Sequence, residues 1–478
     1  MLSTRISYLS QDTLEIMRER VFELLENHGV KMDHAEVVKI LEKAGAKVDS
    51  DSQMVRFPKN FLEEQFRKAP KSFSLVGRNG KQKLGLPRED GTFHTRTNTG
   101  AQSWIEPETG VYRRVRVPDI AIWARLSDRL GEIGFCAFPV PSDVPDATAD
   151  VYALRAMLQN TEKHVWVQPY TEGSVEYLVK LSIAAAGGEE ALKSKPLVSF
   201  ITCSLTPLEF KRMDLEIILQ ASRHGIPLHA CSLPSAGTTG PVSEPGIALL
   251  CVAEILAMLA TAQVIEPGTQ IVATPLIFST DMSTGRSLQS SVESLRSNAL
   301  AVQFVKAAFG IPTHTYGIGA DSPAMDGQCM SEGALRGMLI GVSGADILGA
   351  AGQIEVATTI SPVQLTIDNE VFGMVRRIIT GMNFDDETMA WEDLMNVKPG
   401  GEFLTTDHTY RHCRDGLPPI NFVRSTRESW EQGGQTDLVG RATQFCRNLL
   451  EKAKPVEMPE DVIKEMDCIV RAADDRLI

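Results

Sequence analysis

The spacing of hydrophobic and polar positions divides the chain into three regions. In residues 1–90, apolar positions recur at helical spacing over 10–28, 34–44 and 61–68, with short extended pieces at MVRFP and SFSLVG. From residue 91 the pattern changes to short apolar runs, each of which ends in small or polar residues and precedes a segment of helical period. After about residue 380 the pattern is mixed, and the chain ends in two predicted helices over 438–454 and 459–475.

The middle region contains eight strand-and-helix units, whose starts are 30 to 43 residues apart. Because every parallel connection needs a crossover helix, this period predicts an α/β fold, a closed (β/α)8 TIM barrel over 91–380. An open doubly wound sheet is the alternative, but no GxGxxG opens the first helix. We expect residues 1–90 to form a mainly helical cap and 381–478 to pack on the barrel as a helical extension. The strands are predicted to begin near Phe93, Gly134, His164, Leu197, Pro227, Gln270, Pro312 and Asp346.

Composition and charge narrow the functional class. The chain is 43% hydrophobic and 23% charged, which is typical of a globular protein with a sizeable core. A net charge of -13 repels phosphate backbones and anionic lipids, so we expect neither nucleic acid nor membrane as a partner. Eight cysteines without a CxxC pair favour a reducing, cytoplasmic location. The apolar run 246–265 is predicted to be a buried helix, at an oligomer contact or beneath the cap, because Glu254 interrupts it.

In a barrel, the reacting groups come from the carboxyl ends of the strands and the loops that follow them. None of the eight predicted strand ends contains a lysine, which argues against Schiff-base chemistry. The glycines after strands 7 and 8 have no adjacent arginine or lysine, so a phosphate site there is disfavoured. No HxH or HxxE spacing stands at a strand end, so we expect no bound metal and take His229 and His314 as wall residues.

The strand ends combine aromatic side chains with amides and acids instead. Such a set suits a quaternary ammonium, which has no N–H to donate and is held by aromatic faces and diffuse negative charge. The alternative is that the aromatic side chains fill the barrel and that Asp281 and Asp321 cap helices. The members of the set are Phe138, Trp166, Tyr170, Phe278, Tyr316, Asn98, Gln168, Asp281, Asp321, Gln328 and Glu355.

Several of these segments resemble the trimethylamine methyltransferase family, in its branch without pyrrolysine that includes glycine betaine:corrinoid methyltransferases. The resemblance covers nearly the whole chain in order. It implies a (β/α)8 barrel, a methylated amine as substrate, and methyl transfer to the cobalt of a corrinoid on a separate small protein that docks at the barrel mouth. The matching segments are AGTTGPVSEPGIALLCVAEILA (236–257), PLIFSTDMSTGRSLQSSVES (275–294), GIGADSPAMDGQCMSEGA (317–334), and GGEFLTTDHT with ESWEQGG in the tail.

In the trimethylamine branch, the loop that corresponds to residues 316–321 holds pyrrolysine, whereas here it contains standard residues only. A quaternary amine needs no acid catalyst because it leaves as a neutral amine. We therefore expect a quaternary amine as methyl donor, with glycine betaine first and dimethylglycine as its product. Asp321 and Glu355 are assigned as catalytic residues. The assigned substrate-binding residues are Asn98, Phe138, Trp166, Gln168, Phe278, Tyr316, Gly317, Gly319, Gln328 and Gln353.

Several alternatives stay open on the sequence alone. The methyl donor could instead be carnitine, γ-butyrobetaine, proline betaine or choline. The chain could also be a non-catalytic quaternary-amine binding protein, or an unrelated barrel enzyme for a phosphorylated substrate. A substrate carboxylate could meet Asn98, Gln168, Gln353, His314 or the backbone of 237–240, while Arg96 could face inward or lie exposed. We expect the polar loop 280–289 to order when the corrinoid protein docks, and the chain to form a homo-oligomer.

Overall fold

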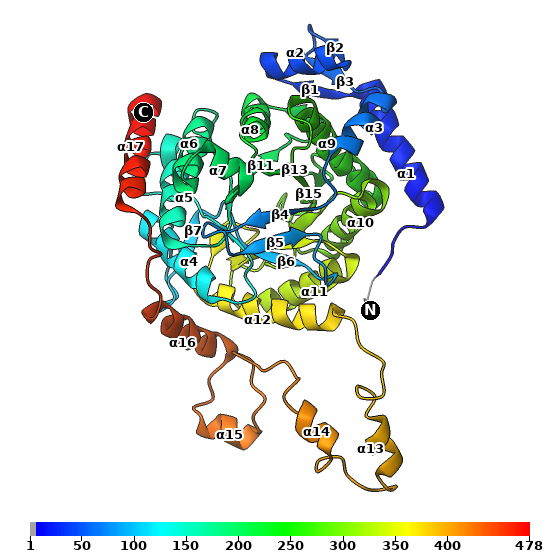
Figure 1. Ribbon diagram of the computed structural model, residues 1–478, viewed down its shortest axis with the longest axis vertical. Coiled ribbons are helices and arrows are strands. Elements are labelled where there is room, and N and C mark those ends of the chain that lie inside the picture. The colour runs from blue at the N-terminus through cyan, green and yellow to red at the C-terminus, as the bar shows by residue number, and fades with distance from the viewer. Residues whose placement is uncertain (1–5) are drawn as a thin grey trace.

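The computed structural model describes residues 6–478, and its N-terminal segment forms a mainly helical unit on one side of the molecule (Figure 1). Ser10 begins the first helix with a capping box, in which its side chain accepts from the backbone N–H of Thr13. The elements of this region are α1 (Gln11–Glu23) with a π turn (Leu24–His28), β1 (Val30–Met32), α2 (Ala35–Ala44), β2 (Lys47–Asp49), β3 (Met54–Arg56) and α3 (Lys59–Lys68). With the π turn included, the three predicted helices of this region are present within two residues of their expected bounds, while β1 and β2 were not predicted.

Eight parallel strands form the centre of the fold, each beginning within two residues of its predicted start. Five of them form one sheet in the order β15-β13-β11-β10-β9, and three form another in the order β18-β19-β6. Parallel bridges between Arg96 and Phe135 and between Ala273 and Thr313 join the two sheets, so each strand has a parallel partner on both sides. We call these strands the strand ring: β6 (His94–Thr97), β9 (Cys136–Ala137), β10 (Val165–Val167), β11 (Val198–Cys203), β13 (Leu228–Ser232), β15 (Ile271–Pro275), β18 (His314–Tyr316) and β19 (Ile347–Ala351).

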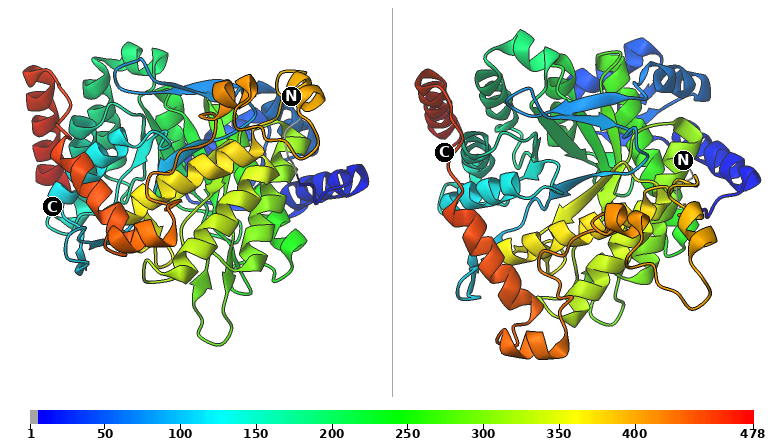
Figure 2. Two further views of the ribbon diagram at one scale, coloured as in Figure 1. Left: turned by 90° about the horizontal axis from the view of Figure 1, so that it is seen from below. Right: turned by 60° about the horizontal axis from the view of Figure 1, so that its bottom comes forward.

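A long helix follows each strand and lies outside the ring (Figures 1 and 2). Shorter pieces lie between them, namely a 3-10 turn (Asp146–Thr148), α7 (Glu189–Ser194) and β12 (Glu209–Phe210), which pairs with β1 of the N-terminal unit. The long helices are α4 (Val117–Arg129), α5 (Ala149–Asn160), α6 (Val175–Ala186), α8 (Arg212–Arg223), α9 (Glu244–Ile265), α10 (Val292–Phe309), α11 (Gly327–Ser343) and α12 (Pro362–Ile379).

Helix α9 is the one helix in residues 6–478 that is long and apolar enough to cross a membrane, and nearly all of it is buried within the fold. It packs against α1, α2 and α3, so it lies beneath the N-terminal unit. The carboxylate of Glu254 accepts hydrogen bonds from the hydroxyls of Ser204 and Ser232 and from the backbone N–H of Leu208. The acid in the middle of the apolar run is therefore fully engaged by polar groups of the fold.

A hairpin of β4 (Phe73–Val76) and β5 (Lys83–Leu86) covers the amino end of the strand ring (Figure 1). Leu75 and Leu84 share a core cluster with interior ring residues such as Phe135. His94 Nε2 lies 2.9 Å from the carbonyl oxygen of Gly85, and His164 Nδ1 lies 3.0 Å from that of Val76. The hairpin therefore closes the amino end of the ring.

Short strands lie in the loops at the carboxyl end of the ring. The predicted loop 280–289 is largely a hairpin, which projects from the molecule in the left view of Figure 2. Helices α10 and α11, which follow β15 and β18, are capped by Ser291 and Asp326. Asp281 and Asp321, which the alternative interpretation proposed as caps, do not cap them, because each helix begins several residues later. These strands are β7 (Ser103–Ile105), β8 (Tyr112–Arg114), β14 (Ser235–Ala236), β16 (Phe278–Thr280), β17 (Ser287–Leu288), β20 (Gln353–Ile354) and β21 (Thr359–Ile360).

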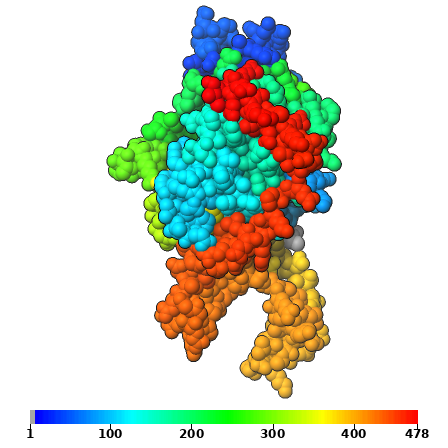
Figure 3. All heavy atoms as spheres, turned by 90° about the vertical axis from the view of Figure 1, so that its left-hand side faces the viewer, coloured from blue at the N-terminus to red at the C-terminus, as the bar shows by residue number. Residues whose placement is uncertain are grey.

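The C-terminal region has two parts. Helices α16 (Leu438–Glu451) and α17 (Glu460–Leu477) lie against the outer helices, and Asp474 accepts hydrogen bonds from Thr148 and Tyr152. The segment before them, residues 381–437, projects away from the ring (Figures 1 and 3), and we call it the arm. It contains α13 (Trp391–Asn396), α14 (Asp407–His412) and α15 (Arg427–Gln432), none of which has a buried residue.

Candidate functional site

Arg96 lies inside the strand ring and is completely buried. Its guanidinium carbon is 4.1 Å from the centre of the Trp166 ring and 5.7 Å from that of Tyr316. The Nε–H donates to Nε2 of His314 at 2.9 Å, and Nη1 donates to the carbonyl oxygen of Thr97 at 2.7 Å. Strands β6, β10 and β18 thus bring an arginine between two aromatic rings, because alternate side chains of each strand point into the ring.

The positive charge of Arg96 has no acidic partner. Burial lowers the pKa of its guanidinium to about 10, so the group remains charged at neutral pH. Within residues 6–478, the groups that favour its charged form are Tyr316 and Cys231, and no carboxylate is among them. The Nη2 atom is buried without a hydrogen-bond partner. A buried cation in this state is costly unless an anion joins it, so the geometry fits an anionic ligand group.

Three histidine side chains are buried inside the ring as well. His164 and His229 each bond the hydroxyl of Ser199, at 2.9 and 3.1 Å, and the rings of His229 and His314 meet edge to face at 5.4 Å. Burial holds the pKa values of His229 and His314 well below their usual range, with Arg96 adding to the effect. His314 is therefore neutral and accepts from Arg96 through Nε2, which assigns its proton to Nδ1.

A group of half-buried side chains lines the carboxyl end above Arg96. Asn98 is fully buried beside them, and its Oδ1 has no hydrogen-bond partner. Burial raises the pKa of Tyr316, so its phenol stays neutral. The surface is made of aromatic, amide, aliphatic and cysteine side chains and can hold a cation without forming an ion pair. The half-buried members are Gln168, Cys203, Leu233, Phe278 and Tyr316.

Hydrogen bonds of Asp321 and Gln289 connect the loops after β15, β18 and β19. The Asp321 carboxylate accepts from the backbone N–H groups of Gln289 and Ser290, at 3.0 and 2.9 Å. Burial raises the pKa of Asp321, and these hydrogen bonds counteract the rise. The amide oxygen of Gln289 accepts from Gln353 at 2.6 Å and from the buried Arg336 at 3.1 Å. Sequence reasoning missed Gln289 and Arg336, because neither belongs to a predicted strand end.

Gly317 and Gly319 are positions of close approach. A Cβ atom on Gly319 would lie 2.4 Å from the side chain of Gln353, and its φ of +97° is one that other residues rarely adopt. A Cβ atom on Gly317 would lie 2.2 Å from Leu348. Neither position can carry a side chain unless its neighbour moves.

The other predicted site residues occupy different surroundings. Glu355, Val356 and Ala357 are consecutive left-handed residues after β20, with φ of 55°, 53° and 69°, and the Glu355 carboxylate accepts from Thr359 at 2.6 Å. Phe138 is fully buried and packs edge-on against Tyr170. Gln328 is exposed in the first turn of α11 and donates to Glu332. The arrangement thus joins Trp166 and Tyr316 to Arg96 directly, while Phe138 packs against Tyr170 and Gln328 donates to Glu332.

These features describe an α/β protein of parallel strands whose interior holds a buried arginine with one unpaired N–H group. The profile of the family described as Trimethylamine methyltransferase (MTTB) matches residues 3–474. The chain belongs to this family and is a methyltransferase.

Named relatives agree with this assignment. The trimethylamine methyltransferase MttB of Desulfitobacterium hafniense (strain DSM 10664 / DCB-2) is 29% identical over 472 residues, which are 98% of this chain and 94% of that protein. A glycine betaine methyltransferase of Desulfitobacterium hafniense (strain Y51) is 26% identical over 433 residues, covering 90% and 89% of the two chains. The crystal structure of the Methanosarcina barkeri monomethylamine methyltransferase (MtmB) superposes with a TM-score of 0.52 at 14% identity, covering 95% of this chain and 90% of that chain, which supports the shared fold.

Proposed function

We propose that this methyltransferase moves a methyl group from a quaternary amine that carries a carboxylate, with glycine betaine as the first candidate, to the Co(I) of a corrinoid on a separate small protein. The product is a tertiary amine such as dimethylglycine. We also infer that the strand ring and its outer helices form a closed (β/α)8 barrel, flanked by an N-terminal cap and a C-terminal extension. The parallel pairing of all eight strands supports this classification.

The observation that carries the proposal is the unpaired cation of Arg96. A substrate carboxylate that reached Nη2 would supply the missing anion and form a charge-assisted hydrogen bond. Betaines, carnitine and γ-butyrobetaine carry such a group, whereas choline and trimethylamine do not. Arg96 therefore favours the zwitterionic substrates over the other two.

The neutral lining above Arg96 is suited to the ammonium end of such a substrate. Arg96 lies closer to Trp166, at 4.1 Å, than to Tyr316, at 5.7 Å, so the trimethylammonium falls to the aromatic rings of Tyr316 and Phe278. Amides of Asn98, Gln168 and Gln353 complete the polar contacts. In this proposal Asp321 acts as a positioning residue that holds the loop before α10, and Glu355 adds negative charge from the left-handed turn. Gly317 and Gly319 let the backbone after β18 approach its neighbours closely, and Phe138 and Gln328 lie outside the contact set.

The reaction requires the protein mainly to orient the substrate. The corrinoid supplies a Co(I) nucleophile that accepts the methyl group, and the electron pair of the broken C–N bond stays on nitrogen. The amine leaves without charge, so no proton donor and no pyrrolysine are required. The protein has to hold one methyl group toward the carboxyl end of the ring, in line with the approaching partner. Exposed apolar side chains on four segments there support a docking surface for it: Tyr112, Leu205, Val242 and Met282.

A substrate panel tests the proposal. Methyl transfer to free cob(I)alamin is measured for glycine betaine, carnitine, γ-butyrobetaine, proline betaine, choline and trimethylamine. For the best betaine we expect Arg96→Met to lower kcat/KM by two to three orders of magnitude, which corresponds to about 3 to 4 kcal/mol for an unpaired buried charge. Arg471→Met, on an exposed arginine of α17, is the matched control and should leave kcat/KM unchanged.

Two results would overturn the proposal. One is a rate with choline or trimethylamine that equals the rate with every betaine. The other is an unchanged kcat/KM in the Arg96 variant. Tight binding of a betaine without any methyl transfer would instead support the binding-protein alternative. Thermal unfolding of Arg96→Met distinguishes loss of the ligand contact from loss of the fold.

We further propose that the protein is cytoplasmic and forms homo-oligomers. Eight free cysteines support a reducing compartment. Exposed apolar side chains gather on the arm, where Phe384, Leu404 and Tyr410 are each more than 70% exposed. Isolated exposure is normal, but such a concentration on one segment is typical of a contact surface. Sedimentation velocity should give a multiple of the 52.4 kDa chain mass, and Leu404→Asp should shift it toward the monomer.

A further inference from the structure

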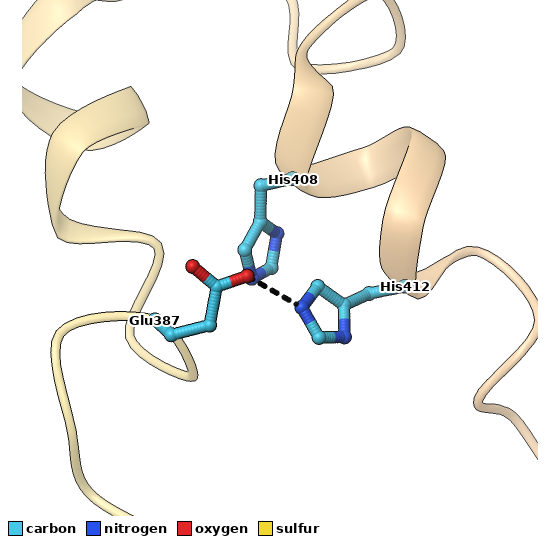
Figure 4. Close-up of side chains that lie close together, drawn as sticks. All are labelled: Glu387, His408 and His412. Carbon is cyan, nitrogen blue, oxygen red and sulfur yellow. Dashed lines mark hydrogen bonds and ion pairs between the residues drawn. The ribbon is translucent and has the colours of Figure 1, made fainter.

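Two histidines and a glutamate converge on the arm, far along the chain from the strand ends. In residues 6–478 they are the one group of three or more His, Cys, Asp or Glu side chains whose ligand atoms all lie within 4.8 Å of one another. His408 and His412 come from the same face of α14, because residues four apart lie one turn from each other. Glu387 comes from the turn before α13. Figure 4 shows both imidazole rings directed toward the glutamate carboxylate.

The geometry points to a site for a divalent transition metal, best Zn²⁺, with Glu387, His408 and His412 as its three protein ligands. Two imidazoles and a carboxylate form one of the ligand sets that zinc prefers, and three protein ligands leave a fourth position for water. The expectation that the chain holds no metal considered only the strand ends. The HxxxH spacing in DHTYRH was the sequence signal for this site.

The ligand atoms are already close to the spacing of a tetrahedral site. His412 Nε2 lies 3.0 Å from Glu387 Oε1, about the separation of two ligands that share one zinc ion. The rings of His408 and His412 have centroids 4.3 Å apart, and Nε2 of His408 is buried without a hydrogen-bond partner. Zn²⁺ would take the place of the proton between His412 and Glu387, and a small movement of His408 would complete the set.

A neighbouring carboxylate orients one of these ligands. Asp415 Oδ2 lies 2.7 Å from Nδ1 of His412, which places the ring proton on Nδ1 and directs the Nε2 lone pair at the metal position. Arg411 also donates to Glu387 Oε1, at 2.9 and 3.1 Å. The carboxylates of Glu387 and Asp415 exceed this one positive charge, so the site retains a net attraction for a dication.

The position of the cluster indicates a structural role. Glu387 and His408 belong to segments of the arm that have no buried residue in their helices, so no apolar core holds them together. A metal ion that joins the two segments would supply the missing cross-link, as it does in small domains with little core. The inference does not rest on the proposed methyl transfer.

Zinc binding to the full chain tests the inference. Protein stripped with a chelator is titrated with ZnCl₂ by calorimetry, and the visible absorption of bound Co²⁺ reports the coordination geometry. We expect one Zn²⁺ per chain. Glu387→Gln, His408→Gln and His412→Gln should each weaken binding more than 100-fold, and Asp415→Asn by roughly 10- to 100-fold. His28→Gln, an exposed histidine outside the cluster, is the matched control and should bind as the wild type does.

A second measurement keeps the result independent of folding. Bound Zn²⁺ should slow proteolytic cleavage between residues 381 and 437 in the wild type but not in His408→Gln, while circular dichroism shows both chains to be folded. Absence of stoichiometric binding to the wild type would overturn the inference. Equal affinity in the wild type and in all three ligand variants would overturn it as well, because the bound metal would then lie elsewhere.

Discussion

The guanidinium of Arg96 lies 4.1 Å above the indole ring of Trp166, and both side chains are buried inside the strand ring. A cation over an aromatic face is stabilised by on the order of 2 kcal/mol when both are desolvated. Trp166 therefore holds Arg96 in place while leaving Nη2 free of a protein partner. This pair links the stability of the ring interior to the proposed recognition of a substrate carboxylate.

The first prediction concerns the aromatic face. Trp166→Leu removes both the ring and part of its volume, so we expect a loss of about 3 to 5 kcal/mol in the free energy of unfolding and a higher KM. Trp166→Phe keeps an aromatic face and should show a smaller loss in both quantities. Urea unfolding and steady-state kinetics measure the two effects. Equal stability of the two variants would show that the cation–aromatic contact does not stabilise the fold.

The second prediction concerns the left-handed turn after β20. A non-glycine residue at φ near +60° costs about 1 to 2 kcal/mol, and glycine relieves this strain at an entropic cost of about 0.5 to 1 kcal/mol. Ala357→Gly should therefore raise the free energy of unfolding by roughly 0.5 to 1 kcal/mol. The same substitution at Ala472, exposed within α17, should lower it by about 1 kcal/mol. A loss of stability in both variants would show that the backbone of Ala357 is not strained.

The third prediction concerns pH. Burial raises the pKa of Asp368 to about 7, while hydrogen bonds from Gly352 and Gln364 counteract the rise. The folded state binds the proton more tightly than the unfolded state, whose Asp has a pKa near 3.8. The contribution of Asp368 to stability is therefore fully present below about pH 4 and is lost as the pH rises toward 7.

Asp368→Asn removes this titration, so the fall in stability between pH 4 and 7 should be shallower in the variant than in the wild type. The difference should reach a few kcal/mol at most. Burial also raises the pKa values of Asp150 and Asp214, to about 6, and both remain in the variant, so part of the slope persists. Urea unfolding at a series of pH values measures this pH dependence. If stability falls equally with pH in both proteins, the raised pKa of Asp368 is contradicted.

The fourth prediction concerns the proposed docking surface. Met282, 67% exposed at the tip of the β16–β17 hairpin, stands next to the loop that follows β14. Met282→Asp should slow methyl transfer to the corrinoid protein about tenfold or more, because it places a charge in an apolar contact. The rate with free cob(I)alamin should stay unchanged. Ile16→Asp, on a residue 61% exposed in α1, is the control. Equal loss with both acceptors would mean that Met282 affects the reaction itself.

Much of the fold could be predicted from local sequence. The apolar runs near His164 and Pro312, for example, predicted β10 and β18 within two residues, because burial on both faces of a parallel strand leaves a continuous apolar signature. The helical period likewise predicted α2 and α17. The hairpin at 278–288 was not predicted, because its polar residues have the composition of a loop and pair only after β14 provides an edge.

The sequence by itself determined the eight-unit pattern, the buried character of α9 and the residue types available at the strand ends. Only the tertiary structure decided that Arg96 faces the interior between Trp166 and Tyr316, and that Glu387 meets His408 and His412 on the arm. The physical reason is that periodicity reports whether a position is buried, whereas electrostatic partners depend on which strands and loops become neighbours. Residues hundreds of positions apart, such as Arg96 and His314, therefore acquire their chemistry only in the folded ring.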